Sequence, residues 1–240
     1  MLRSPSIRFA PGLVLALLVG LASTTLSRSV GAAADAPTAA VLYFDYDGKD
    51  ADLALLRKGL AQMLISDLSG NDSIRVVERD RLQEILGELK LQSSNKIDQA
   101  SAVKAGKLLG ARYLVLGAYF DVMKSFRADT RVVDVQTGQV VYSTGATGKP
   151  EDFLALEQKL GGDLGHYFST TLPKAKPPSQ ARRTAKPPAA LPARTLVEYG
   201  RALDAIDNGD KGKAKESLAK VLKDQPDFQL ASFDLDKLMQ

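Results

Sequence analysis

The chain has 240 residues, a formal net charge of +4, no cysteine, no tryptophan and a single histidine, His166. The lack of cysteine excludes disulfides, thiolate metal sites and a cysteine nucleophile. With 45% hydrophobic and 25% charged residues, the composition is that of an ordinary globular protein of one or two domains.

Residues 1–34 have the pattern of a secretory signal peptide. Arg3 and Arg8 precede a charge-free apolar run from Gly12 to Ala22, and alanines at 32–34 offer a cleavage site before Asp35. The run is well short of the ~20 residues that a membrane-spanning helix needs. A lipid anchor would require a cysteine at the cleavage point. We therefore predict a periplasmic or secreted protein of the cell envelope, with the signal peptide cleaved.

Removal of residues 1–34 takes away three arginines and no acid, so the net charge falls from +4 to +1. We therefore expect no nucleic-acid partner.

Residues 35–172 alternate strand-like and helix-like patterns. Apolar runs predict buried strands, and leucines spaced by three and four predict helices. Gly138 is expected to adopt a positive φ in a hairpin turn. The expected strands are 39–46, 74–77, 113–120, 126–135 and 140–143, and the expected helices are 52–69, 82–89, 97–109 and a last one that Pro150 opens. This order predicts an α/β fold, a three-layer α/β/α domain with a mixed sheet.

Several segments of this domain together resemble a known family. They are AVLYFDY, LRKGLAQMLISDL, IRVVERDRLQEIL, KLLGARYLVLGAY and RVVDVQTGQVVYSTG, in this order. The set is similar to the CsgG-like family of curli secretion and to its relatives, the TolB amino-terminal-like domain and the periplasmic activators of penicillin-binding proteins. The resemblance covers nearly all of 35–172. It implies an envelope protein that works through protein contacts rather than catalysis.

Residues 173–192 are predicted to form a basic, proline-rich linker. The stretch has six prolines and no acid, and its cations are Lys174, Lys176, Arg182, Arg183 and Lys186. Proline fixes φ and removes amide donors, so an extended spacer is expected. The simplest interpretation is a solvated linker. Peripheral contact of these cations with anionic lipid or a cell-wall polymer is left open.

Residues 193–240 are predicted to form a small C-terminal α-helical hairpin. Helices are expected over 195–207 and 211–223, with a turn at Asn208-Gly209 and a further helix over 230–239. With Thr195 as position 1, the spacing of Ala202, Ala214 and Pro226 resembles a single tetratricopeptide (TPR) unit. A lone repeat buries its apolar face poorly, so it should pack on the first domain, a second copy or a partner. The expected partner-binding residues of this hairpin are Tyr199, Ala202, Leu203, Ala214 and Leu218.

Candidate catalytic or metal-binding residues are few. Asp45, Asp47, Asp50 and Asp52 cluster after the first strand and are weak candidates for a metal site, but turn formation and helix capping explain them more simply. His166 lacks a second histidine or cysteine and is expected to be a surface or core-edge residue. We therefore expect no catalytic residue, no cofactor and no metal.

The favoured hypothesis is a non-enzymatic, exported CsgG-like binding or scaffold protein that mediates protein–protein contacts in envelope or surface-polymer assembly or secretion. Its expected partners are envelope proteins, and a homo-oligomer is left open. One alternative is an oligomeric accessory or pore subunit of a curli-type outer-membrane secretion system. Only five residues separate Phe120 from Phe126, however, whereas a membrane-crossing strand needs ~9–11. The other alternative is a metal-dependent enzyme that uses Asp45, Asp47 and Asp50.

Overall fold

The computed structural model describes residues 36–91, 96–122, 125–173, 185–186, 188 and 190–240. The predicted signal peptide and most of the predicted linker, including Lys174, Lys176, Arg182 and Arg183, lie outside these described residues. Within the described part, no helix combines the length and the apolar character needed to cross a membrane.

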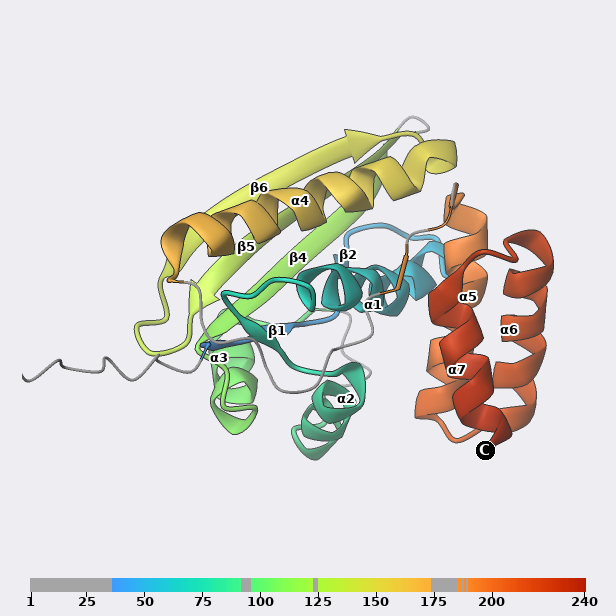
Figure 1. Ribbon diagram of the computed structural model, residues 1–240, viewed down its shortest axis with the longest axis horizontal. Coiled ribbons are helices and arrows are strands. Elements are labelled where there is room, and N and C mark those ends of the chain that lie inside the picture. The colour runs from blue at the N-terminus through green and yellow to red at the C-terminus, as the bar shows by residue number, and fades with distance from the viewer. Residues whose placement is uncertain (1–35, 92–95, 123–124, 174–184, 187, 189) are drawn as a thin grey trace, which may run out of the picture. The chain divides into compact units, whose positions relative to one another are not determined.

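The α/β portion contains six strands, four α-helices and two short 3₁₀ helices (Figure 1). In chain order they are β1 (Thr38–Val41), β2 (Asp45–Tyr46), η1 (Leu53–Leu55), α1 (Leu56–Leu68), β3 (Arg75–Val76), α2 (Arg79–Glu88), α3 (Gln99–Leu108), β4 (Tyr113–Val122), β5 (Ser125–Asp134), β6 (Val140–Gly148), η2 (Pro150–Asp152) and α4 (Phe153–Thr171).

These strands form one mixed sheet, as predicted. Its order is β3-β1-β4-β5-β6, with β2 also paired to β4. Strand β1 pairs in parallel with β3 and β4, whereas β4, β5 and β6 form an antiparallel meander. In the β5–β6 turn, Gly138 has a φ of +70°, which confirms the expected conformation. Strands β3 and β6 are the two edges of the sheet.

The first predicted strand, 39–46, is wrong as a single element. It is divided into β1 and β2, because the pairing to β4 slips by one residue between Val41 and Asp45. One extra residue in this segment acts like a bulge. Between the two strands, the Phe44 ring lies against Gly117 of β4, where a Cβ would come 2.2 Å from the ring. The glycine is thus needed for this packing.

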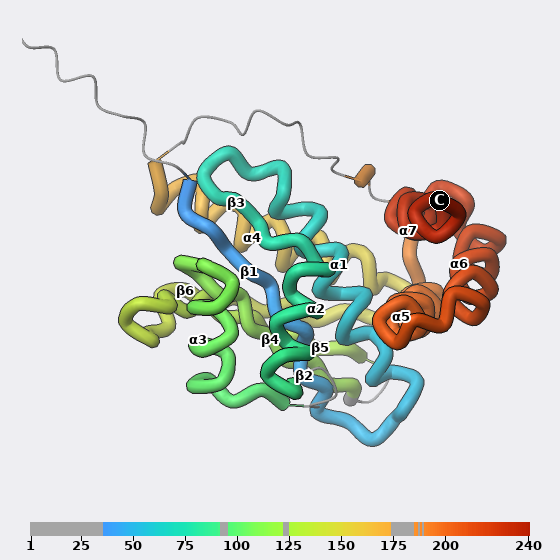
Figure 2. Tube along the Cα trace, turned by 90° about the horizontal axis from the view of Figure 1, so that it is seen from below, coloured from blue at the N-terminus to red at the C-terminus, as the bar shows by residue number. Residues whose placement is uncertain are grey.

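Helices cover both faces of the sheet, which confirms the three-layer prediction. Adjacent residues of a strand point to opposite faces. On β4, the Tyr113 ring lies 5.7 Å from that of Phe168 in α4, whereas Leu114 lies against Gly106 in α3. Helices α3 and α4 are therefore on opposite sides of the sheet (Figure 2). Helix α1 contacts α4, and α2 contacts α3.

The C-terminal residues form the predicted helical hairpin and a third helix. These are α5 (Ala193–Asp207), α6 (Lys211–Asp224) and α7 (Gln229–Met239). Gly209 between α5 and α6 has a φ of +75°, a conformation that glycine adopts without strain. The Tyr199 ring of α5 packs edge-on against Phe228 at 4.9 Å, and its hydroxyl donates to Asp234 of α7 at 2.7 Å. All three helices thus share one small core.

Helix α5 packs on α1 of the α/β portion, so the described residues form one compact unit. Two glycines allow the close approach. A Cβ on Gly200 would lie 1.9 Å from the carbonyl oxygen of Leu55, and a Cβ on Gly59 would lie 2.8 Å from Leu196. The sequence left open whether the hairpin packs on the first domain, a second copy or a partner. In the structure it packs on the first domain. Helix α1 supplies the surface that a neighbouring repeat would supply in a TPR array.

A buried ionic cluster holds the same contact. Arg79 of α2 is 6% exposed and forms an ion pair and hydrogen bond with Asp207 of α5. Lys58 of α1 lies 2.8 Å from Asp207 and 2.7 Å from Asp204. Because buried charges are costly unless they are paired, this cluster favours one position of α5 over others.

Candidate functional site

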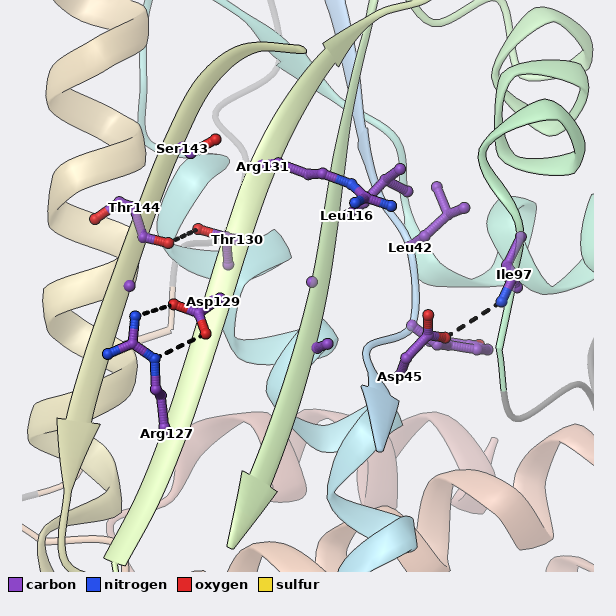
Figure 3. A pocket seen from close by; sticks show the side chains of 14 residues that line it. Leu42, Asp45, Ile97, Leu116, Arg127, Asp129, Thr130, Arg131, Ser143 and Thr144 are labelled. Atoms are coloured by element: carbon purple, nitrogen blue, oxygen red, sulfur yellow. Dashed lines mark hydrogen bonds and ion pairs between the residues drawn. The ribbon is translucent and has the colours of Figure 1, made fainter. Parts of the chain in front are cut away.

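A hollow lies on the sheet face that carries α3 (Figure 3). It has a volume of about 540 Å³. Its residues come from the end of β1 and the segment after it, from Ile97 before α3, and from the middle of β4, β5 and β6. Helix α3 covers Leu114 but leaves the farther half of the antiparallel meander open.

Strand pairing places the residues of the hollow in two rows. Directly opposed residues in an antiparallel sheet project to the same face. The rows consist of Leu116, Arg131 and Ser143, and of Ala118, Asp129 and Gly145. Each row therefore runs from an apolar residue on β4, through a charged residue on β5, to a small residue on β6.

Of the three charged residues of β5 in the hollow, two pair with each other and the third does not. Arg127 donates two hydrogen bonds to Asp129, of 2.9 and 2.6 Å, and the hydrogen bond to Asp129 raises the pKa of Arg127. Gly145 leaves room for this pair, since a Cβ there would lie 2.3 Å from an Asp129 oxygen. Arg131, in contrast, has no hydrogen-bond or ion-pair partner within the described residues, and its side chain extends toward Leu116 (Figure 3).

Asp45 forms the opposite wall of the hollow. Its carboxylate accepts a hydrogen bond of 3.3 Å from the backbone N–H of Ile97. Partial burial raises the pKa of Asp45, although this hydrogen bond and the nearby Arg57 and Lys96 oppose the shift. The carboxylate is therefore held against the segment before α3.

This arrangement is suited to binding. An unpaired guanidinium above apolar side chains can receive a carboxylate that is attached to an apolar segment. His166 is exposed on α4, and α4 lies on the other face of the sheet. No group of three or more His, Cys, Asp or Glu residues that could hold a metal ion occurs in the part of the chain that the structure describes.

The four aspartates considered as weak metal candidates have separate partners. Asp45 accepts from Ile97, and Asp47 forms an ion pair with Lys96. The Asp50 carboxylate accepts from the backbone N–H groups of residues 52 and 53, at 2.9 and 3.2 Å, so it stabilises the turn that leads into η1. Asp52 forms an ion pair of 2.9 Å with Arg201 of α5. The cluster in sequence is thus not a cluster of converging carboxylates.

The residues expected to bind partners through the hairpin are all buried. Tyr199, Ala202, Leu203, Ala214 and Leu218 are each 0% exposed. They hold the C-terminal helices together and onto the first domain, because small and apolar residues at these positions allow close helix packing. Any partner of these helices must therefore contact other, exposed residues. The exposed Lys186 is the one expected linker cation within the described residues.

The hollow was not predicted from the sequence. Its β5 residues carried a signal, because Arg127, Asp129 and Arg131 are charged at every second position of a predicted strand. That alternation predicts one polar face. It does not show that the same face is left uncovered by helices.

Comparisons with known proteins agree with the resemblance seen in the sequence. Residues 33–122 match the family model of the curli production assembly/transport component CsgG. No match was found in the search of curated proteins.

Three solved structures illustrate the remote structural similarity. The LpoB C-terminal domain from Salmonella enterica is 15% identical to this chain, with a TM-score of 0.39. The match covers 50% of this chain and 87% of the LpoB chain. The PelC dodecamer subunit from Paraburkholderia phytofirmans is 14% identical, with a TM-score of 0.32 over 60% and 92%. TolB from Acinetobacter baumannii is 13% identical, with a TM-score of 0.31 over 58% and 30%.

Proposed function

We propose that this chain is a non-enzymatic component of the bacterial cell envelope that binds other envelope proteins during surface-polymer assembly or secretion. The observation that carries the proposal is the match of residues 33–122 to the family of a curli production assembly/transport component. The signal-peptide pattern of residues 1–34 supports export to the same compartment.

The geometry of the site supports binding. The hollow on the sheet is open, has an apolar floor and contains an unpaired arginine among the described residues, Arg131. A second surface lies on the C-terminal helices. It is a groove of about 360 Å³ along α5 and α6, with charged residues such as Lys213, Glu216 and Lys220 in its walls. The hollow and the groove are formed by different elements, so the chain offers two separate contact surfaces.

Site-directed photo-crosslinking in intact cells tests this function. A photoreactive residue is introduced in separate variants at Ser143 in the hollow, at Glu216 in the groove and at His166 on α4. We expect an envelope protein to be captured from the hollow or the groove, and less of it from position 166. The full chain is needed, because deletion of residues 193–240 would uncover the face of α1 that α5 covers.

Cell fractionation provides the second measurement. We expect the processed chain in the periplasmic or extracellular fraction. The proposal is wrong if the precursor stays in the cytosol with residues 1–34 attached, or if none of the three positions yields an envelope-protein adduct.

A further inference from the structure

Helix α4 carries a buried acid on the side that faces α1. Glu157 is 1% exposed, and one of its carboxyl oxygens has no hydrogen-bond partner within the described residues. The Glu157 carboxyl shares a side-chain hydrogen bond with Asp67 of α1. Gly161, one turn farther along α4, leaves room for the Asp67 carboxylate, because a Cβ there would lie 3.2 Å from one of its oxygens. The two carboxyl groups are therefore held together where α1 and α4 pack.

One of these two acids must hold a proton in this arrangement. Two carboxylates in contact repel each other, and a buried carboxylate without a partner is costly. The cavity beside the pair measures about 10 Å³, roughly the space of one water molecule, so it has no room to hydrate a second charge. Burial and the Asp67 carboxyl raise the pKa of Glu157 well above its ordinary value of 4.5. Glu157 is therefore the acid that holds the proton and donates it to Asp67.

The surroundings of the pair do not compensate a second negative charge. The cavity is lined by α1, α4, the start of α7 and residues 185, 186 and 188. Besides the two acids, Lys186 is the one titratable group among the lining residues, and it is exposed and forms no ion pair with either acid in the described structure. The start of α7 contributes the apolar side chains of Phe228 and Leu230. Loss of the shared proton therefore leaves two like charges in contact, one of them buried.

Residues 185 and 186 cover one side of this cavity. The backbone N–H of Ala185 donates to the Ser66 hydroxyl of α1 at 3.2 Å, and the backbone N–H of Lys186 donates to the side chain of Gln229 in α7 at 2.7 Å. Ser66 directly precedes Asp67, so the first of these hydrogen bonds depends on the same turn of α1. A movement of this turn relative to α4 would therefore release residues 185 and 186.

We propose that the Asp67–Glu157 pair is a pH-sensitive switch that keeps α1, α4 and residues 185–186 packed together while it holds a proton and opens this joint when the proton is lost. Asp67 is exposed, so the proton has a direct route to water. The closed form binds the proton more tightly than the open form, so it is favoured at low pH and is lost as pH rises through the raised pKa of the closed state. Opening uncovers apolar side chains of α1 and α7. The switch does not depend on the proposed binding function.

Amide hydrogen exchange on the full mature chain tests the switch. Exchange at the N–H groups of Ala185 and Lys186 is followed by NMR from pH 5 to 9, and each rate is divided into the intrinsic rate at that pH to give a protection factor. The loss of one proton changes an opening equilibrium by up to about tenfold per pH unit. We expect the protection factors of both amides to fall by at least about tenfold in total across this range, while Val221 in α6 stays protected.

Two variants separate the pair from other titrating groups. Glu157→Gln places a neutral donor beside Asp67, so Ala185 and Lys186 should stay protected at every pH. Glu84→Gln removes an exposed acid on α2, where Glu84 pairs with Arg81, and should keep the wild-type profile. Circular dichroism checks that both variants are folded.

Four results would overturn the proposal. The first is the same pH dependence in the wild type and in Glu157→Gln. The second is a wild-type chain in which Ala185 and Lys186 are unprotected at every pH. The third is a parallel loss of protection at Val221, because the chain would then unfold as a whole. The fourth is protection that rises with pH, because Lys186 would then hold the ionised pair closed. None of these results changes what crosslinking captures, so the switch and the binding function fail separately.

Discussion

Replacing Asp207 with asparagine should weaken the contact between α5 and the α/β portion. The Asp207 side chain is 4% exposed and lies between Arg79 and Lys58. Lys58 would keep Asp204 as a partner, but Arg79, whose side chain is 7% exposed, would lose its buried anionic partner. Removing one partner of a buried ion pair destabilises a protein by about 3–5 kcal/mol. The amide can still accept a hydrogen bond, so the lower end of this range is expected.

For a chain of this size, a loss of about 3 kcal/mol corresponds to a fall in Tm of about 6–12 °C. Thermal and urea unfolding followed by circular dichroism measure this change. Limited proteolysis should also cut the variant faster near residues 185–192, because α5 would separate more often from α1.

A matched control removes a charge from an exposed ion pair. Glu84→Gln removes the ion pair between Glu84 and Arg81, whose side chains are both more than half exposed. Such a pair contributes about 0–1 kcal/mol, so the Tm of this variant should change by no more than about 4 °C. If Asp207→Asn is no more destabilising than Glu84→Gln, burial of the ionic cluster does not hold α5 in place and the reasoning is refuted.

Three further predictions concern other contacts. Gly200→Ala should destabilise by about 1–3 kcal/mol in urea unfolding, because its methyl group would meet the backbone of Leu55 at the end of η1. Gly162→Ala, with open space around it, should instead stabilise by about 0.5–1 kcal/mol, and equal effects would argue against the close approach of α5. Burial and the Asp67 carboxyl raise the pKa of Glu157, so stability should be fullest below the ordinary pKa of 4.5 and fall as pH rises through the higher folded value. Glu157→Gln should remove much of this fall in a series of Tm measurements from pH 4 to 9, and an unchanged pH profile would contradict the assignment. Tyr199→Phe should cost about 1–3 kcal/mol in the same unfolding assay, because it leaves the partly buried carboxylate of Asp234 in α7 without its hydrogen-bond donor, and a neutral result would show that water replaces the hydroxyl.

The amino-acid sequence by itself determined where most helices and strands of the described residues lie, although not that residues 39–46 are divided into β1 and β2. Apolar spacing of three and four residues identified the helices around Leu60 and Leu160, and apolar runs identified β1 and β4. Glycines predicted the turns at 138 and 209, both of which have positive φ. These features are local, because each depends on residues close together in the chain.

Only the tertiary structure decided which surfaces are covered and which charges are paired. The pattern of α5 showed an apolar face but not that α1 covers it. The five residues expected at a partner surface are buried among the C-terminal helices and against the first domain. Four aspartates that are neighbours in sequence point to four different partners. The physical reason is that burial and ion pairing depend on residues far apart in the chain, such as Arg79 and Asp207, and a local pattern does not specify which distant element comes into contact.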